Sequence, residues 1–141
     1  MKVLIDANVL LDVLGRREPH YADSAQVWDL AEAGTIEGYV SAASLPTLFY
    51  ILRRAKGTDA ALEGIRLVRD TFEIVALDEH VVNQALDSDM RDFEDAIQLV
   101  SSFRAGAVVL ITRDAKGFAA SNLVVQTPRQ FLVTRFPSGQ S

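Results

Sequence analysis

The stretch that decides the fold is Met1-Lys-Val-Leu-Ile-Asp6-Ala-Asn8-Val-Leu-Leu-Asp12. Residues 3–5 are all apolar, which is the pattern of a strand buried on both faces in a parallel sheet. The run ends abruptly in a carboxylate, which is costly to bury unless its charge is compensated. Two roles are open for Asp6. It caps the helix that begins near Asn8, or it binds a cation at the carboxyl edge of the sheet, where open α/β sheets place their sites.

The composition predicts one globular domain. The chain has 141 residues, of which 49% are hydrophobic and 23% are charged, and this is enough to build a real core. It has no cysteine, no signal-peptide pattern and no apolar run long enough to span a bilayer. We therefore expect a cytoplasmic protein without membrane contact, with a domain over residues 1–136 and a disordered tail over residues 137–141.

The net charge of −5 at pH 7 argues against a simple cationic nucleic-acid binder. It does not exclude a nuclease, because acids that hold a divalent cation invert their local potential and then attract phosphate. The charge therefore slightly favours a metal-dependent role over plain electrostatic binding.

Strand-like and helix-like segments alternate along the chain. Apolar runs predict strands at residues 3–5, 36–40, 72–77, 107–111 and 124–125. Amphipathic segments between them predict helices, among them residues 8–14, 21–33 and 79–86. This order gives an α/β fold with a parallel sheet, and right-handed crossovers place the helices on both of its faces.

Particular side chains have predicted places in these helices. Trp28 is expected to anchor the core. Two helices have apolar side chains that are expected to face inward, namely Leu62, Ile65, Leu67 and Val68 on one and Phe93, Ile97, Val100 and Phe103 on the other. Three helix starts have candidate caps, at Ser41 to Ser44, Asp78 and Asp92.

Three acids far apart in the sequence are predicted to meet at one edge of the sheet. Asp6 and Asp114 follow the first and fourth strands, and the helix that begins near Asp95 feeds a parallel strand and so starts at the same edge. Two ionised carboxylates about 4 to 5 Å apart repel by roughly 3 to 4 kcal/mol at an effective dielectric of about 20. Three such groups therefore need a proton or a metal ion.

The types of side chain at this edge select the ion. Oxygen ligands without a set of histidines or cysteines favour Mg²⁺ or Mn²⁺ over zinc. His20 and His80 are expected on the solvated surface, away from the acids. Such an ion can activate water for attack on a phosphodiester and stabilise the developing oxyanion.

Each acid also has a structural explanation when it is taken alone. Asp92 suits a helix cap and Glu94 suits the helix dipole. Asp95, three residues after the cap, fits either a capping box or a ligand. Asp114 fits a turn. Only their predicted convergence with Asp6 favours a functional site.

Four stretches taken together resemble a PIN domain, and most closely the bacterial VapC-like toxin ribonucleases. They occur in order and cover nearly the whole chain: residues 3–12, Asp92-Phe-Glu-Asp95-Ala-Ile-Gln98, Ile111-Thr-Arg-Asp114-Ala-Lys-Gly117-Phe118 and Thr127-Pro-Arg-Gln-Phe-Leu132. The resemblance implies a three-layer α/β/α fold with a five-stranded parallel sheet. It also implies Mg²⁺ or Mn²⁺, endonucleolytic cleavage of RNA, frequent homodimers and an antitoxin protein as partner.

The resemblance assigns roles by position. Asp6 and Asp95 would be metal ligands, Asn8 and Thr112 would support the site through hydrogen bonds, and two further acids could join it, namely Asp12 and Glu94.

The chain departs from the PIN pattern at two positions. Thr47 stands where many PIN domains carry an acid, and Gly117 stands where they carry a late one. Asp114, three residues earlier, could replace that late carboxylate. The expected catalytic and metal-binding set is therefore Asp6, Asp95 and Asp114, with Thr47 and Asp92 among the supporting residues.

Three functions remain open at this point. The leading hypothesis is a metal-dependent endoribonuclease of the toxin type. The alternative is a catalytically degenerate PIN module that binds RNA or a protein partner without cleavage. A phosphatase with Asp6 as nucleophile ranks last, because its usual second acid is Asn8 here.

Overall fold

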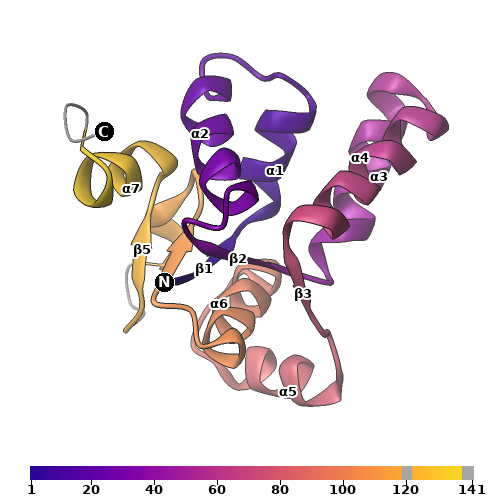
Figure 1. Ribbon diagram of the computed structural model, residues 1–141. Coiled ribbons are helices and arrows are strands. Elements are labelled where there is room, and N and C mark those ends of the chain that lie inside the picture. Colours follow the sequence, from indigo (N-terminus) through magenta and orange to yellow (C-terminus); the bar gives the residue numbers. More distant parts are fainter. Residues whose placement is uncertain (119–121, 138–141) are drawn as a thin grey trace.

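The computed structural model describes residues 1–118 and 122–137 (Figure 1). Five parallel strands form one sheet in the order β3-β2-β1-β4-β5. The strands are β1 (Lys2–Ile5), β2 (Glu37–Ser41), β3 (Glu73–Val75), β4 (Val109–Ile111) and β5 (Val124–Gln126). The predicted five-stranded parallel sheet is confirmed, although β3 and β4 are shorter than the apolar runs at residues 72–77 and 107–111 suggest.

Helices cover both faces of this sheet. They are α1 (Ala7–Leu14), α2 (Tyr21–Glu32), α3 (Ser44–Lys56), α4 (Thr58–Thr71), α5 (Glu79–Asp87), α6 (Phe93–Ala105), α7 (Pro128–Arg135) and the short 3₁₀ helix η1 (Ala115–Phe118). Figure 1 shows α1, α2 and α7 on one face and α5 and α6 on the other, while α3 and α4 form a hairpin to one side. The fold is thus the predicted three-layer α/β/α arrangement. No helix among the described residues is long and apolar enough to cross a membrane.

The central strand β1 is apolar throughout its buried part because helices lie on both sides of it. Val3 and Ile5 pack in the larger core, beside residues of α1, α2 and α7. Leu4 packs with Leu110 of β4 in the second core, against α6. Because successive side chains of a strand point to opposite faces, a strand between two helical layers needs an apolar residue at every position.

The connections between strands run towards opposite edges of the sheet on the two sides of the β1–β4 pair. From β1 the chain crosses to β2 and β3 on one side, and it later returns to β4 and β5 on the other. The backbone N–H of Asp6 donates to the carbonyl oxygen of Ile111 at 2.9 Å, so the ends of these two strands are joined. In open α/β sheets this reversal leaves a crevice beyond the carboxyl ends of the strands.

The predicted inward face of α4 is wrong at Leu62 and Leu67, whereas Val68 is buried as predicted and Ile65 packs against the core. Leu62 and Leu67 are 39% and 45% exposed, and the buried face is made by Ala61, Gly64 and Val68. Small residues form this face because α4 packs closely on α3. A Cβ atom at Gly64 would lie 3.1 Å from Cδ1 of Leu52.

The predicted inward face of α6 is also wrong at both ends. Phe93 and Phe103 are 43% and 54% exposed, whereas Ile97 and Val100 are buried as expected. Phe93 begins the helix at the carboxyl edge, where it lines a cavity instead of entering the core.

The predicted helix caps are confirmed at two sites and wrong at one. The carboxylates of Asp78 and Asp92 accept from backbone N–H groups at the starts of α5 and α6. Helix α3 instead has Ala43 at its N-cap position and no capping side chain. Ser41 Oγ accepts from the N–H of Ala43 at 3.1 Å, and Ser44 is already the first helical residue.

The expected core position of Trp28 is confirmed. The side chain is 8% exposed and meets the ring of Phe72 edge to face, with 5.0 Å between the ring centroids. Except for Pro137, the tail that is predicted to be disordered lies outside the described residues.

The Phe72 ring makes Gly38 of β2 sensitive to substitution. A Cβ atom at Gly38 would lie 2.6 Å from Cδ1 of Phe72. We expect Gly38→Ala to lower the free energy of unfolding by about 1 to 3 kcal/mol, because a rigid ring must move. Urea denaturation measures this. Gly64→Ala is the matched control, since its Cβ atom meets only the methyl ends of two flexible leucines, Leu52 and Leu14, and the variant should be nearly neutral. Equal stability of the two variants would contradict the explanation.

Candidate active site at the carboxyl edge

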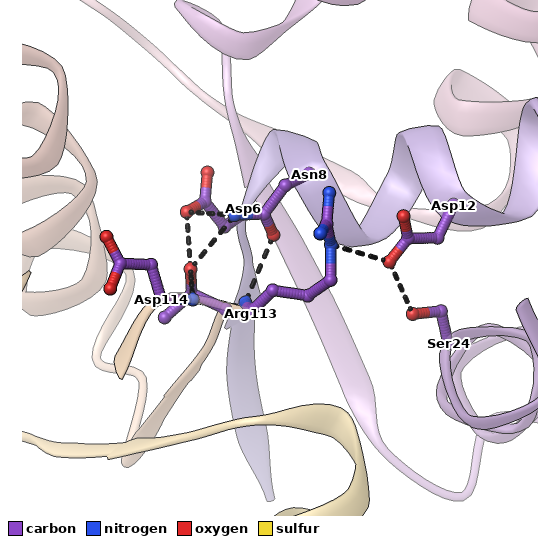
Figure 2. Close-up of polar contacts among 7 residues, drawn as sticks. Asp6, Asn8, Asp12, Ser24, Arg113 and Asp114 are labelled. Atoms are coloured by element: carbon purple, nitrogen blue, oxygen red, sulfur yellow. Dashed lines mark hydrogen bonds and ion pairs between the residues drawn. The ribbon is translucent and has the colours of Figure 1, made fainter. Parts of the chain in front are cut away.

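Asp6 lies at the end of β1 and is held by side chains from two segments (Figure 2). Thr112 Oγ1 donates to Asp6 Oδ2 at 2.7 Å, and Asn8 Nδ2 approaches the same oxygen at 3.4 Å. Asp6 occupies the N-cap position of α1, but its side chain makes no capping hydrogen bond. Of the two roles left open by the sequence, capping is therefore excluded.

The loop after β4 is bound to this carboxylate through Asn8 and Thr112. Asn8 accepts from the N–H of Arg113 at 3.2 Å and donates to Thr112 Oγ1 at 3.2 Å. Thr112 Oγ1 also accepts from the N–H of Asp114 at 3.2 Å. Asn8 and Thr112 thus connect the Asp6 carboxylate to the loop after β4, and their support of an active site stays a prediction.

A cavity of about 270 Å³ opens beside Asp6. Glu94 and Asp95 from the first turn of α6 line it, together with Thr47 from α3. The cavity therefore gathers polar side chains from three separate segments. Its remaining lining residues are Ala7, Ala43, Ser44, Phe93, Ile97 and Gln98.

The environment raises the pKa of both aspartates in the cavity. Desolvation raises the pKa of Asp6, against the lowering effect of the Thr112 hydrogen bond. Desolvation, followed by repulsion from Asp92, Asp6 and Asp114, raises the pKa of Asp95 to about 6. The acids thus act on one another electrostatically, and a cation among them would relieve the repulsion.

Asp114 lies near Asp95 but outside the lining of the cavity. Gly117, in η1, lies between them, since a Cβ atom there would be 3.1 Å from Asp95 Oδ2 and 3.6 Å from Asp114 Oδ2. The missing side chain at Gly117 leaves space between these two carboxylates.

The set of donors at this edge suits a hard divalent ion, because carboxylate oxygens surround the space without histidine or cysteine. However, no group of three His, Cys, Asp or Glu side chains in residues 1–118 and 122–137 is arranged to hold a metal ion as it stands.

Two of the expected site residues have structural roles. Asp92 Oδ1 accepts from the N–H of Asp95 at 3.0 Å and so caps α6. Asp12 has no exposed surface and pairs with Arg113, whose Nε lies 3.0 Å from Asp12 Oδ2. Ser24 Oγ donates to the same oxygen at 3.1 Å. Figure 2 shows Arg113 extending from the site to Asp12, which therefore anchors the loop after β4.

His80 is exposed as expected, but His20 is partly buried and lines a second cavity with Arg113. The sequence predicts no place in the site for Arg113, Ser44 or Gln98. A signal for Arg113 is its position between Thr112 and Asp114. Ser44 and Gln98 are 54 residues apart, and no local pattern indicates that Gln98 Nε2 donates to Ser44 Oγ at 2.9 Å.

Known proteins share this fold. The crystal structure of VapBC2 from Rickettsia felis has a TM-score of 0.70 and 14% identity, covering 90% of this chain and 98% of that one. The structure of VapC20 from Mycobacterium tuberculosis has a TM-score of 0.69 and 15% identity, covering 84% and 95%. A toxin–antitoxin complex from Klebsiella pneumoniae has a TM-score of 0.68 and 21% identity, covering 89% and 97%.

Sequence comparison assigns the family. Ribonuclease VapC1 from Aquifex aeolicus (strain VF5) is 26% identical over 135 residues, which are 92% of this chain and 92% of that protein. The profile of the PIN domain matches residues 2–116, which include Asp6, Asp95 and Asp114. With its fold, its acidic crevice and this match over most of its length, the chain belongs to the PIN domain family.

Proposed function

We propose that this protein is a metal-dependent endoribonuclease and the toxin of a toxin–antitoxin pair. The observation that carries the proposal is the cavity at the carboxyl edge, which Asp6 and Asp95 both line and where the pKa of Asp95 is raised to about 6. Membership of the PIN family and the likeness to ribonuclease VapC1 support the reaction class.

Asp6, Asp95 and Asp114 would hold Mg²⁺ or Mn²⁺, with Glu94 close by. When bound, the ion supplies Lewis-acid stabilisation of the phosphodiester oxyanion and activates water. The chain itself orients the carboxylates. Thr112 and Asn8 hold Asp6 through Oδ2, and the backbone N–H of Asp95 is tied to Asp92. Thr47 adds a neutral hydroxyl to the cavity.

The partners follow from the same comparison. RNA is the proposed substrate, and an antitoxin protein is the proposed inhibitor, because the structural neighbours include toxin–antitoxin complexes. We also propose a homodimer.

One observation favours a second candidate, a PIN module that binds RNA or a protein without cleaving RNA. Thr47 and Gly117 replace acids, and the described residues contain no ready group of three metal ligands. Calorimetry separates the two candidates. Absence of Mn²⁺ binding together with an intact RNA complex would favour the non-cleaving module.

We expect the protein to cleave RNA with Mn²⁺ and to lose this activity with a chelator. Asp95→Asn should lower the cleavage rate by more than about 100-fold, because loss of a ligand exceeds the usual effect of an outer-shell change. Gel analysis of labelled RNA measures this. Asp92→Asn is the matched control, since asparagine caps a helix as well as aspartate does and the rate should stay within about threefold. An unchanged cleavage rate in Asp95→Asn would contradict the assignment of Asp95 as a catalytic metal ligand.

The raised pKa of Asp95 predicts a pH-dependent stability without metal. The folded state keeps a proton to about pH 6, whereas the unfolded state releases it near the model value of 3.8. Stability from this group is therefore present below about pH 4 and is lost as the pH rises through about 6. In chelator at pH 7, Asp95→Asn should melt at a higher temperature than the wild type. Added Mn²⁺ should stabilise the wild type more than the variant. A variant that melts lower in chelator would contradict the proposed repulsion.

Gly117 provides a separate test of the metal site. Gly117→Ala places a Cβ atom 3.1 Å from Asp95 Oδ2, so the carboxylate must move. We expect the calorimetric dissociation constant for Mn²⁺ to increase by about 10-fold. Lys116→Ala, one residue earlier in η1, should leave it unchanged. Equal Mn²⁺ affinity in both variants would show that the ion does not use this space.

A further inference from the structure

Gln98 lines the site cavity and has an unpaired buried oxygen. Its side chain is 6% exposed, Nε2 donates to Ser44 Oγ at 2.9 Å, and Oε1 has no hydrogen-bond partner among the described residues. Turning the amide over would leave the nitrogen unpaired instead, because Ser44 is the single hydrogen-bond partner of this amide in the part of the chain that the structure describes. Buried polar atoms are normally paired, so an unpaired one on a residue that lines a cavity points to a partner bound there.

The position of this pair relates it to the acids. Gln98 follows Asp95 by three residues on α6, and residues at this spacing have Cβ atoms about 5 to 6 Å apart on one face of a helix. Ser44 is the first residue of α3 and is 2% exposed. Both line the same cavity as Asp6 and Asp95. A group bound by the pair would therefore lie one helical turn from the proposed reaction centre.

The chemistry of the pair selects a hydroxyl group. Ser44 Oγ accepts from Gln98, so the hydroxyl hydrogen of Ser44 remains to be donated, while Gln98 Oε1 remains to accept. A hydroxyl donates and accepts through one atom and so satisfies both. A phosphate oxygen would be repelled by the carbonyl, and a base amino group would satisfy the carbonyl alone.

We propose that Gln98 and Ser44 bind the ribose 2′-hydroxyl of the nucleotide next to the cleaved phosphate and thereby select RNA over DNA. The 2′-hydroxyl is the group by which a protein distinguishes the two nucleic acids. This inference rests on the proposed ribonuclease function and specifies how its substrate is recognised.

Phe93 completes the nucleotide subsite. Its side chain is 43% exposed and lines the same cavity. An exposed aromatic ring offers a stacking surface for the attached base, and stacking tolerates any base and either sugar. Phe93 therefore contributes affinity, whereas Gln98 and Ser44 contribute the preference for ribose.

The test compares two strands of the same mixed sequence, one of RNA and one with 2′-deoxyribose throughout. Fluorescence anisotropy in the presence of a chelator gives the dissociation constant of each strand. The ratio of the two constants measures the preference for RNA. Each lost hydrogen bond weakens binding about 3- to 10-fold, so the dissociation constant of the wild type should be lower for RNA than for DNA by at least that factor. Gln98→Leu and Ser44→Ala should each reduce the ratio by about 3- to 10-fold. The second variant keeps the test valid if the first folds poorly.

Matched controls separate recognition from general effects. Gln126 Oε1 is also buried without a partner, but Gln126 lies on β5 and does not line this cavity. Gln126→Leu should keep the wild-type ratio. Phe93→Leu should weaken RNA and DNA alike, by about threefold or more, and also keep the ratio. Unchanged affinity in the Phe93 variant would overturn its stacking role.

A wild-type ratio in both Gln98→Leu and Ser44→Ala would overturn the ribose contact, as would a wild type without preference for RNA. These outcomes are distinct from failure of the proposed function. If the wild type cleaves RNA with Mn²⁺ while its preference for RNA over DNA does not depend on Gln98, the ribonuclease function is supported and the ribose subsite is contradicted. If the wild type binds RNA with the predicted preference but does not cleave it, the ribose subsite is supported and the nuclease function is contradicted.

Discussion

The parallel pairing of β1 with β4 is the constraint on which both the core and the site depend. The register places Ile5 beside Ile111, so the residues that follow, Asp6 and Thr112, meet at the crevice. A slip of one residue would turn every side chain of a strand to the opposite face. Leu4 would then leave its core at the same time as Asp6 lost Thr112. Apolar packing on both faces thus also fixes the position of the catalytic candidate.

The electrostatic arrangement divides the buried charges into two groups. Asp12 is compensated by Arg113 and so serves the structure, because it secures the loop that carries Thr112 and Asp114. In the part of the chain that the structure describes, the carboxylates around Asp95 have no ion pair of this kind. Desolvation, followed by their repulsion, raises the pKa of Asp95. Uncompensated charge reduces stability, and it persists in proteins mainly where function requires it.

Local rules succeeded where a short segment decides its own structure. Asp78 and Asp92 cap helices because an aspartate oxygen reaches N–H groups within the same turn. The same rules failed for Leu62 and Phe93, because the face that a helix buries depends on which neighbour packs against it. On α4 the close approach of α3 buries the small face around Gly64. On α6 the first turn projects past the sheet, so that Phe93 borders a cavity.

The sequence by itself determined the succession of strands and helices along the chain, the position of Asp6 at the end of a buried strand and the set of acids available at that edge. These follow from periodicity and from the rule that parallel strands end on one side of a sheet. Only the tertiary structure decided that Asp6 bonds to Thr112 instead of capping α1, that Asp12 pairs with Arg113, and that Gln98 meets Ser44. Each of these contacts joins segments distant in the chain. Their geometry depends on strand register and on the rotation of packed helices, which no single segment encodes.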